Sequence, residues 1–175
     1  MTENLLIREV KRSEQRMLGE FMVEVYSNIE GFPAPAELPD YYEMLVNAGR
    51  LNEEKDFKVL VAETADEQIA GGIVYCADMA KYGSAGTATL EKHASGIRLL
   101  CVDPRFRRLG VGQTLTNACI ALARQDGQQQ VILHTTQMMQ VAWNLYQKMG
   151  FERSPDLDFC ADGIDVFGFR LWLSQ

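Results

Sequence analysis

Residues 102–115 read VDPRFRRLGVGQTL, and this stretch decides the interpretation of the whole chain. A run of apolar residues ends, a basic turn follows, and Gly-Val-Gly opens a segment with apolar residues at helical spacing. Backbone N–H groups at a helix N-terminus lack intrahelical partners and carry partial positive charge. Gly110 and Gly112 have no Cβ, so an anion can approach the backbone. Arg107 and Arg108 add positive charge, and the stretch therefore predicts a phosphate or pyrophosphate site.

Three phosphate-binding patterns compete for this stretch. A dinucleotide-binding fingerprint needs a third glycine where this chain has Leu115, and a Walker A loop needs a Gly-Lys-Ser/Thr sequence that is absent. The third pattern is Arg/Gln-x-x-Gly-x-Gly/Ala, which Arg107, Gly110 and Gly112 match. It is the coenzyme A loop of the GNAT superfamily of N-acetyltransferases, so the stretch resembles that loop. The competing structural interpretation is a strand-to-helix turn with two solvated arginines.

A second stretch, MQVAWNLYQKMGF at residues 139–151, resembles the later signature of the same superfamily. The positions in register with that signature are Ala142, Leu145, Tyr146, Gly150 and Phe151. The chain is therefore similar to GNAT enzymes most strongly over residues 96–151, with the two signatures in the family's order.

The pattern of apolar residues, glycines and prolines predicts a mixed α/β chain. Strands are expected at residues 5–10, 57–63, 69–76, 96–102, 131–135 and 166–173. A first helix is expected from about Ser13 to near Gly31, and further helices at 41–48, 112–124 and 138–149. The resemblance implies the GNAT acyltransferase fold, in which helices flank a central, mixed but mostly antiparallel sheet with splayed central strands. One domain is expected over residues 1–175.

Composition excludes several other classes of protein. The chain has 175 residues and a formal net charge of −7, which argues against a general nucleic-acid binder. It has no apolar run long enough to cross a bilayer and no signal-peptide pattern at its start, so a cytoplasmic location is expected. The four cysteines have no CxxC spacing and only two histidines accompany them. No metal site is therefore predicted, and the cysteines are interpreted as core residues.

The resemblance implies that acetyl-CoA is the cosubstrate and assigns residues to it. The backbone of Leu100, Cys101 and Val102 is expected to contact the pantetheine arm, and a strand N–H near Cys101 or Val102 to bind the acetyl carbonyl. The pyrophosphate is expected to bind the residues around the motif, which are Arg107, Arg108, Leu109, Gly110, Val111, Gly112 and Gln113.

The implied chemistry is direct attack of a neutral amine on the thioester, which needs a base and an acid. Tyr146 is predicted to be the general acid, because it stands at the family position whose hydroxyl commonly points at the sulfur; the alternative is a core tyrosine. Many relatives have a glutamate near the positions that Gly96 and Arg98 occupy here. The base is therefore left open among His134, Glu91 and a water chain.

The acceptor is implied to lie near the loop between the first two helices, GFPAPAELPD at residues 31–40, and near late strands. Phe32, Tyr41 and Tyr42 either wall this pocket or pack on the core. A small-molecule amine is the leading acceptor, with protein N-termini or lysines as the alternative, and a non-catalytic acyl-CoA-binding module as a third hypothesis. Homodimers occur in the superfamily, but the sequence fixes neither the oligomeric state, nor the acyl-chain preference, nor the identity of the amine.

Overall fold

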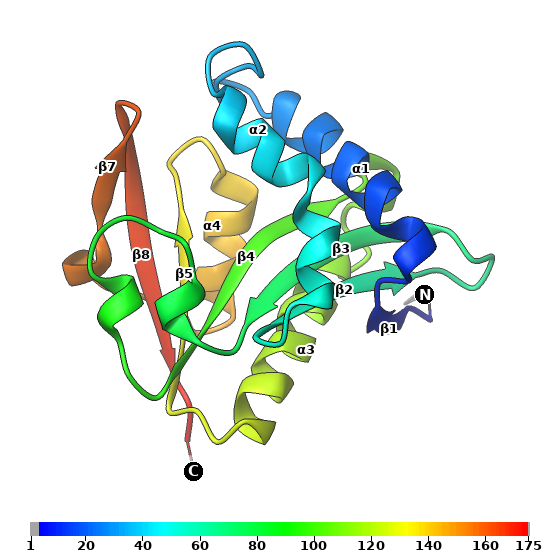
Figure 1. Cartoon of the computed structure of the whole chain (residues 1–175). Helices are drawn as coiled ribbons and strands as arrows, with labels where there is room; N and C mark the ends of the chain where they lie inside the picture. Colours follow the sequence, from blue (N-terminus) through cyan, green and yellow to red (C-terminus); the bar gives the residue numbers. More distant parts are fainter. Residues whose placement is uncertain (1–3, 175) are drawn as a thin grey trace. The chain divides into compact units, whose positions relative to one another are not determined.

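The computed structural model describes residues 4–174 of the chain (Figure 1). Within them, the α-helices are α1 (Gln15–Ser27), α2 (Pro39–Val46), α3 (Val111–Gln125) and α4 (Gln140–Lys148). The strands are β1 (Leu6–Glu9), β2 (Phe57–Glu63), β3 (Ile69–Cys76), β4 (Ala94–Val102), β5 (Gln130–Thr135), β6 (Glu152–Arg153), β7 (Phe159–Ala161) and β8 (Ile164–Trp172). The hydrogen-bonded strand order is β1-β2-β3-β4-β5-β8-β6, with β7 paired to β8.

This architecture confirms the expected fold class, a mixed and mostly antiparallel sheet flanked by helices. β4 and β5 pair in parallel, whereas antiparallel ladders join β8 to β5, β6 and β7, and β1 to β2. The strands β2 and β3 have the predicted bounds, and α3 and α4 differ from the predicted ranges by one or two residues at each end. The very short strands β6 and β7 were not predicted, because two or three residues cannot show a periodicity.

The chain forms two compact units. The first comprises residues 4–74 and 99–116 of the described chain, and the second comprises residues 75–98 and 117–174. The prediction of one domain over residues 1–175 stays a prediction, and residues 1–3 and 175 lie outside the described range. No helix within residues 4–174 combines the length and the apolar character that crossing a membrane requires.

In the first unit, α1 and α2 pack side by side (Figure 1). The contact is close because Gly19 has no side chain: a Cβ there would lie 1.9 Å from the carbonyl oxygen of Val46. Helix α1 buries Leu18, Met22 and Tyr26, which recur every four residues and so share one face. These side chains build the core of the unit together with residues such as Leu45, Val59 and Val61.

In the second unit, β5 lies between β4 and β8. Its parallel ladder with β4 runs from Ala94↔Gln130 to Ile97↔Leu133, and its antiparallel ladder with β8 covers all six β5 residues. Every β5 residue except His134 is buried, and both neighbours of the strand cover its apolar centre, Val131 to Leu133. His134 is the polar side chain that this strand leaves partly exposed.

Candidate active site

The predicted cofactor strand has an unusual backbone at Leu99. This residue has a φ of 58°, which is rare for a bulky side chain, although it lies in the middle of β4 and is buried. It follows the last residues of the ladder with β5, which pairs Ile97 with Leu133. Leu99 therefore separates the part of β4 that pairs with β5 from the part expected to bind the pantetheine arm.

The hydrogen bonds of Asp103 show which edge of β4 each peptide group faces. The Asp103 N–H donates to the Ala70 carbonyl of β3 over 2.8 Å. Peptide groups alternate between the two edges of a strand, so Cys101 also faces β3. The carbonyl oxygen of Cys101 does lie there, 2.6 Å from where a Cβ on Gly71 would be. The N–H and C=O groups of Val102 therefore face the other edge, as do those of Leu100.

This alternation favours one of the two predicted donors to the acetyl carbonyl. Of the N–H groups of Cys101 and Val102, the Val102 group has the orientation that a ligand along the edge away from β3 requires. The Cys101 thiol also stays protonated and is a poor nucleophile, because burial raises its pKa to about 12. Its Sγ lies 3.7 Å from the Gly72 carbonyl oxygen. Cys101 therefore contributes packing rather than a ligand contact at this edge.

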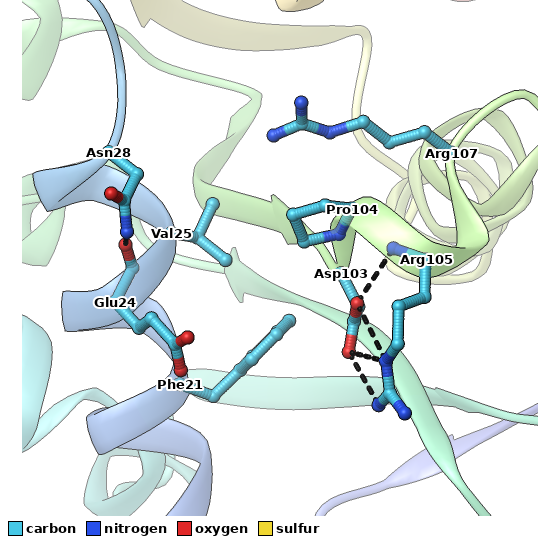
Figure 2. Close-up of a pocket in the computed structure, with 8 residues that line it drawn as sticks. All are labelled: Phe21, Glu24, Val25, Asn28, Asp103, Pro104, Arg105 and Arg107. Atoms are coloured by element: carbon cyan, nitrogen blue, oxygen red, sulfur yellow. Dashed lines mark hydrogen bonds and ion pairs between the residues drawn. The ribbon is translucent and has the colours of Figure 1, made fainter.

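The turn after β4 is held in shape by its own charges. The Asp103 carboxylate accepts from the backbone N–H of Arg105 and from its guanidinium, each over 2.8 Å (Figure 2). The hydrogen bond and charge of Arg105 keep the pKa of Asp103 below its ordinary value despite partial burial. Arg105 belongs to the basic turn within residues 102–115, but its charge is used within the turn.

Arg107 and Arg108 differ from Arg105 in this respect. Both are exposed, and neither guanidinium forms a hydrogen bond or ion pair with another residue in the range 4–174. Figure 2 shows the Arg107 side chain extending over Pro104, apart from the Asp103–Arg105 ion pair. Both positive charges therefore remain available to an anion beside the helix that follows.

Helix α3 begins as the phosphate-site prediction requires. Arg108 and Gly110 both have positive φ, at 67° and 77°, and the helix starts at Val111. The first intrahelical bond runs from the Thr114 N–H to the Gly110 carbonyl over 2.9 Å. The N–H groups of Val111, Gly112 and Gln113 consequently have no acceptor among residues 4–174.

These observations fit a bound pyrophosphate. Three amides at the helix start lack partners, two guanidiniums are unpaired within the described chain, and the space beside Gly110 is open, since a Cβ there would meet nothing within 4 Å. The loop residues predicted to bind the cofactor are thus gathered at one helix start.

A pocket of about 410 Å³ lies beside this turn in the same unit (Figure 2). Its lining residues are Phe21, Glu24, Val25, Asn28, Asp103, Pro104, Arg105 and Arg107. The sequence analysis missed the three from α1 and Asn28, which caps it, although their spacing of three and four residues marks one face of a helix. Arg107 belongs both to the pocket wall and to the predicted coenzyme A motif.

Tyr26 is a second residue that the sequence analysis did not select. Its hydroxyl donates to the carbonyl oxygen of Leu100 over 3.1 Å. Its ring lies 6.1 Å from the ring centroids of both Phe32 and Tyr41, which are themselves 5.6 Å apart. The aromatic residues of the predicted acceptor loop therefore pack on a residue that contacts the predicted cofactor strand.

In the second unit, Tyr146 lies on α4. It is 5% exposed, and its ring packs against Phe151 with centroids 5.7 Å apart. Burial raises the pKa of its phenol well above 10, and the buried Tyr82 and Cys119 add to the shift. The phenol is therefore protonated at neutral pH, as a general acid must be. Trp143 on the same helix packs against Phe167 and Phe169, as expected for a packing residue.

His134 has both ring nitrogens engaged. Nε2 lies 2.9 Å from the Leu157 carbonyl oxygen, so Nε2 carries the hydrogen, and Nδ1 accepts from the Tyr82 hydroxyl at 3.0 Å. Burial lowers the pKa of His134. These contacts favour the structural role over that of a general base, since the basic lone pair is already used.

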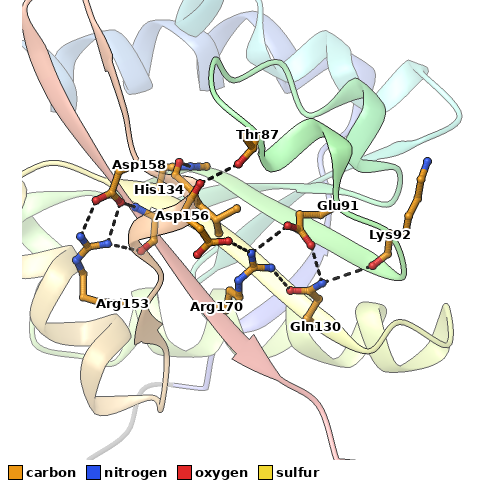
Figure 3. Close-up of polar contacts among 11 residues, drawn as sticks. Thr87, Glu91, Lys92, Gln130, His134, Arg153, Asp156, Asp158 and Arg170 are labelled. Atoms are coloured by element: carbon orange, nitrogen blue, oxygen red, sulfur yellow. Dashed lines mark hydrogen bonds and ion pairs between the residues drawn. The ribbon is translucent and has the colours of Figure 1, made fainter.

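Glu91 is held in an ion pair (Figure 3). Its carboxylate accepts from Arg170 Nη2 over 3.0 Å and from Gln130 Nε2 over 3.3 Å, and Arg170 also pairs with Asp156. The hydrogen bond from Arg170 is the main reason that the pKa of Glu91 is below its ordinary value. A carboxylate that holds its charge so firmly is a weak base, so this contact disfavours the Glu91 alternative.

The family glutamate expected near residues 96 and 98 has no room at one of these positions. A Cβ on Gly96 would lie 2.4 Å from the ring of Tyr82. Arg98 donates to the Tyr82 carbonyl over 2.8 Å and lies over the Tyr82 ring. Both positions therefore serve the packing of Tyr82.

The cysteines are only partly as predicted. Cys76, Cys101 and Cys119 are buried, but Cys160 on β7 is exposed, which corrects its interpretation as a core residue. β7 is a short strand at which a side chain reaches solvent. Within residues 4–174, no group of three or more His, Cys, Asp or Glu side chains is placed to hold a metal ion.

Comparison with known proteins places the chain in a family. A family model described as an acetyltransferase (GNAT) domain matches residues 37–173. N-alpha-acetyltransferase 30 of Homo sapiens is 32% identical over 78 residues, which are 44% of this chain and 22% of that protein. The match thus spans less than a quarter of that relative's length.

Two solved structures have the same fold. A GNAT acetyltransferase from Staphylococcus aureus Mu50 superposes with a TM-score of 0.74 at 19% identity, covering 98% of this chain and 100% of that one. The PaiA N-acetyltransferase from Thermoplasma acidophilum, solved with coenzyme A, gives 0.70 at 16% identity and covers 94% and 98%. With the family model matching well over half of its residues, the chain belongs to the GNAT acetyltransferase family.

Proposed function

We propose that this protein transfers the acetyl group of acetyl-CoA to the primary amine of a small molecule. The observation that carries the proposal is the start of α3, where three N–H groups lack acceptors among the described residues beside the unpaired Arg107 and Arg108. A similar structure, PaiA, was solved with coenzyme A, which supports the same class of ligand here. When bound, acetyl-CoA would supply the activated acetyl thioester.

Residues of the first unit are assigned to hold the cofactor. The backbone of Leu100 and Val102 would pair with the pantetheine arm along the edge of β4 that faces away from β3. The pyrophosphate would bind Arg107, Arg108, Leu109, Gly110, Val111, Gly112 and Gln113, chiefly through backbone N–H groups. Cys101, between the two pairing residues, would support this edge through its buried side chain.

Two residues are assigned to the chemistry. The Val102 N–H would donate to the acetyl carbonyl oxygen, where negative charge develops as the amine attacks. Tyr146 would act as the acid by donating a hydrogen bond to the departing sulfur, because its phenol is protonated at neutral pH. The thiolate, whose thiol has a pKa near 8.5, would take up the proton that the attacking nitrogen releases, relayed through this hydroxyl, so that Tyr146 ends the reaction protonated. With His134 and Glu91 both engaged in structural bonds, water is the proposed route by which the ammonium form of the acceptor loses its proton.

The acceptor loop favours a small molecule. Prolines stiffen it, and two hydrogen bonds close it: the Tyr42 hydroxyl donates to the Pro33 carbonyl over 2.7 Å, and the Ala34 N–H donates to the Glu37 carboxylate over 2.7 Å. A stiff, internally bonded loop suits a shaped pocket more than an open peptide groove. A cytoplasmic location and a homodimer stay predictions from the sequence and from the family.

Acetylation of protein N-termini is the second candidate function. It is favoured by the sequence similarity to N-alpha-acetyltransferase 30, which covers 44% of this chain. The two candidates share the cofactor site and differ only in the acceptor, so one assay with two classes of acceptor separates them.

The proposal is tested by calorimetry followed by turnover. Acetyl-CoA is titrated into the full chain, and thiol release is then measured with a panel of small amines and a panel of peptides with free N-termini. Turnover of small amines supports the proposal, and turnover of peptides alone supports the second candidate. Binding without any turnover indicates the non-catalytic module, and a folded chain that does not bind acetyl-CoA contradicts all three.

A further inference from the structure

A single tyrosine connects the acceptor loop to the cofactor strand. Tyr26 lies in the last turns of α1, is 5% exposed, and donates its hydroxyl hydrogen to the Leu100 carbonyl over 3.1 Å. The two residues are 74 positions apart, so this bond exists only in the folded chain. It joins a helix that ends at the acceptor loop to the strand that would hold the thioester.

The bond from Tyr26 lies on the edge of β4 that faces away from β3. The Leu100 carbonyl faces the same edge as the Val102 N–H, since the Asp103 N–H faces β3 and peptide groups alternate. A carbonyl oxygen can accept two hydrogen bonds, so the bond from Tyr26 leaves one for a ligand. Tyr26 therefore contacts the cofactor edge without closing it.

The ring of Tyr26 connects its helix to the acceptor loop. Phe32 belongs to the loop between α1 and α2, and Tyr41 lies in the first turn of α2. Both rings pack on Tyr26 with centroids 6.1 Å away, and on each other at 5.6 Å. The loop thus packs on the Tyr26 side chain through Phe32, and the start of α2 does so through Tyr41. The Tyr26 hydroxyl in turn bonds Leu100.

We infer that Tyr26 is a positioning residue that fixes the acceptor loop relative to the thioester. The inference rests on the proposed function, because it takes the loop to hold the amine and β4 to hold acetyl-CoA. Reacting atoms must be held about 3–3.5 Å apart, and a misplacement of about 1 Å can cost about 100-fold in rate. Losing the Tyr26 hydroxyl should therefore lower kcat while leaving cofactor binding intact.

The test compares Tyr26→Phe with Tyr75→Phe. Tyr75 is also buried, but its hydroxyl bonds Ser95 and Asp126 of the second unit, and it has no assigned part in binding the acceptor or the cofactor. Each substitution keeps the ring and removes the hydrogen bonding of one buried tyrosine. Only Tyr26→Phe removes the bond between α1 and the strand proposed to hold the cofactor.

Hydrogen exchange with acetyl-CoA as the probe needs no knowledge of the acceptor. In the wild type, acetyl-CoA should slow amide exchange in residues 99–103 and also in residues 28–38. Tyr26→Phe should keep the first effect and lose the second, whereas Tyr75→Phe should keep both. With any amine that the wild type acetylates, kcat of Tyr26→Phe should fall about 10- to 100-fold, with the KM for acetyl-CoA changed by less than about threefold.

The outcomes separate this inference from the proposed function. If the loop is still protected by acetyl-CoA in Tyr26→Phe, or if Tyr75→Phe lowers kcat as much, Tyr26 is only a packing residue and the inference fails. If the wild-type chain shows no protection of residues 99–103, the cofactor assignment fails first, and the inference fails with it.

Discussion

The Tyr82 hydroxyl and Nδ1 of His134 lie 3.0 Å apart, a hydrogen bond between two buried or half-buried rings. Nε2 carries a hydrogen because it faces the Leu157 carbonyl. Burial lowers the pKa of His134, which favours a neutral imidazole whose Nδ1 accepts from Tyr82. A histidine in this arrangement stabilises the fold around β5 and makes stability depend on pH.

The first prediction concerns that dependence. Burial is the main cause that lowers the pKa of His134, with a smaller contribution from Arg98, while the Leu157 carbonyl and Asp158 oppose the shift. The unfolded chain takes up this proton near pH 6.5, so below about 6.5 it binds more protons than the folded chain. The free energy of unfolding should therefore fall as the pH drops from 7.5 to 5.5.

Urea denaturation at several pH values measures this effect. His134→Gln should be less stable at pH 7.5 but should flatten the pH dependence. The control His93→Asn changes an exposed histidine that has positive φ, which asparagine tolerates, and it should retain the wild-type slope. An unchanged slope in His134→Gln would show that another group causes the pH dependence.

The second prediction uses two glycines with the same backbone geometry. Gly110 and Gly127 have φ of 77° and 71°, and a Cβ on either would meet nothing within 4 Å. Alanine at each should cost about 1–2 kcal/mol of stability, because positive φ is unfavourable for residues with a side chain. Only Gly110→Ala crowds the proposed pyrophosphate site.

Calorimetry with acetyl-CoA distinguishes the two variants. Gly110→Ala should weaken binding about 10- to 100-fold, since each hydrogen bond to a charged group is worth about 1.5–3 kcal/mol. Gly127→Ala should bind like the wild type. Equal affinities in both variants would mean that the pyrophosphate does not approach Gly110.

The third prediction concerns the general acid. Tyr146→Phe should lower kcat by about 10²- to 10⁴-fold, the usual contribution of a positioned acid, with little change in acetyl-CoA affinity. The matched control is Tyr75→Phe. Tyr75 is also buried, but its hydroxyl bonds Ser95 over 2.7 Å and Asp126 over 2.6 Å and has no assigned catalytic role.

Steady-state thiol release with an accepted amine measures both variants. Tyr75→Phe should lose stability and keep kcat, because its bonds only join parts of the second unit. A Tyr146→Phe variant with wild-type turnover would identify Tyr146 as a core tyrosine, which is the alternative that the sequence left open.

The fourth prediction tests the role of Glu91. Glu91→Gln keeps an acceptor for Arg170 but removes the negative charge, so the free energy of unfolding should fall modestly. Its kcat should stay within about threefold of the wild-type value, whereas losing a general base usually lowers kcat by ~10²-fold. Arg170→Met should be far more damaging, by about 3–5 kcal/mol, because it leaves Glu91 and Gln130 without their buried partner. Turnover and thermal unfolding of both variants check this assignment. A large loss of kcat in a stable Glu91→Gln would restore Glu91 as the base.

Local features of the chain could be predicted because they depend on residues that are close together in the sequence. The strands β2 and β3 follow from short apolar runs between turn residues, and α3 follows from helical spacing after a glycine turn. The cofactor loop depends on the same local information, since helix-terminal amides, glycines and arginines all lie within residues 107–113. The sequence by itself therefore determined the fold class and the family, and it predicted the anion site.

Only the tertiary structure decided which residues, far apart in the sequence, contact the candidate base, the candidate cofactor strand and the acceptor loop. Glu91 is paired with Arg170, 79 positions away, which disfavours it as the base. The Cys101 peptide group faces β3, because the Asp103 N–H bonds Ala70 there and peptide groups alternate, so it faces away from the edge proposed to hold the cofactor. The role of Tyr26 depends on a bond to Leu100 across 74 positions. No periodicity or spacing encodes such contacts, because a side chain's partner is set by the packing of whole elements and not by its neighbours in the chain.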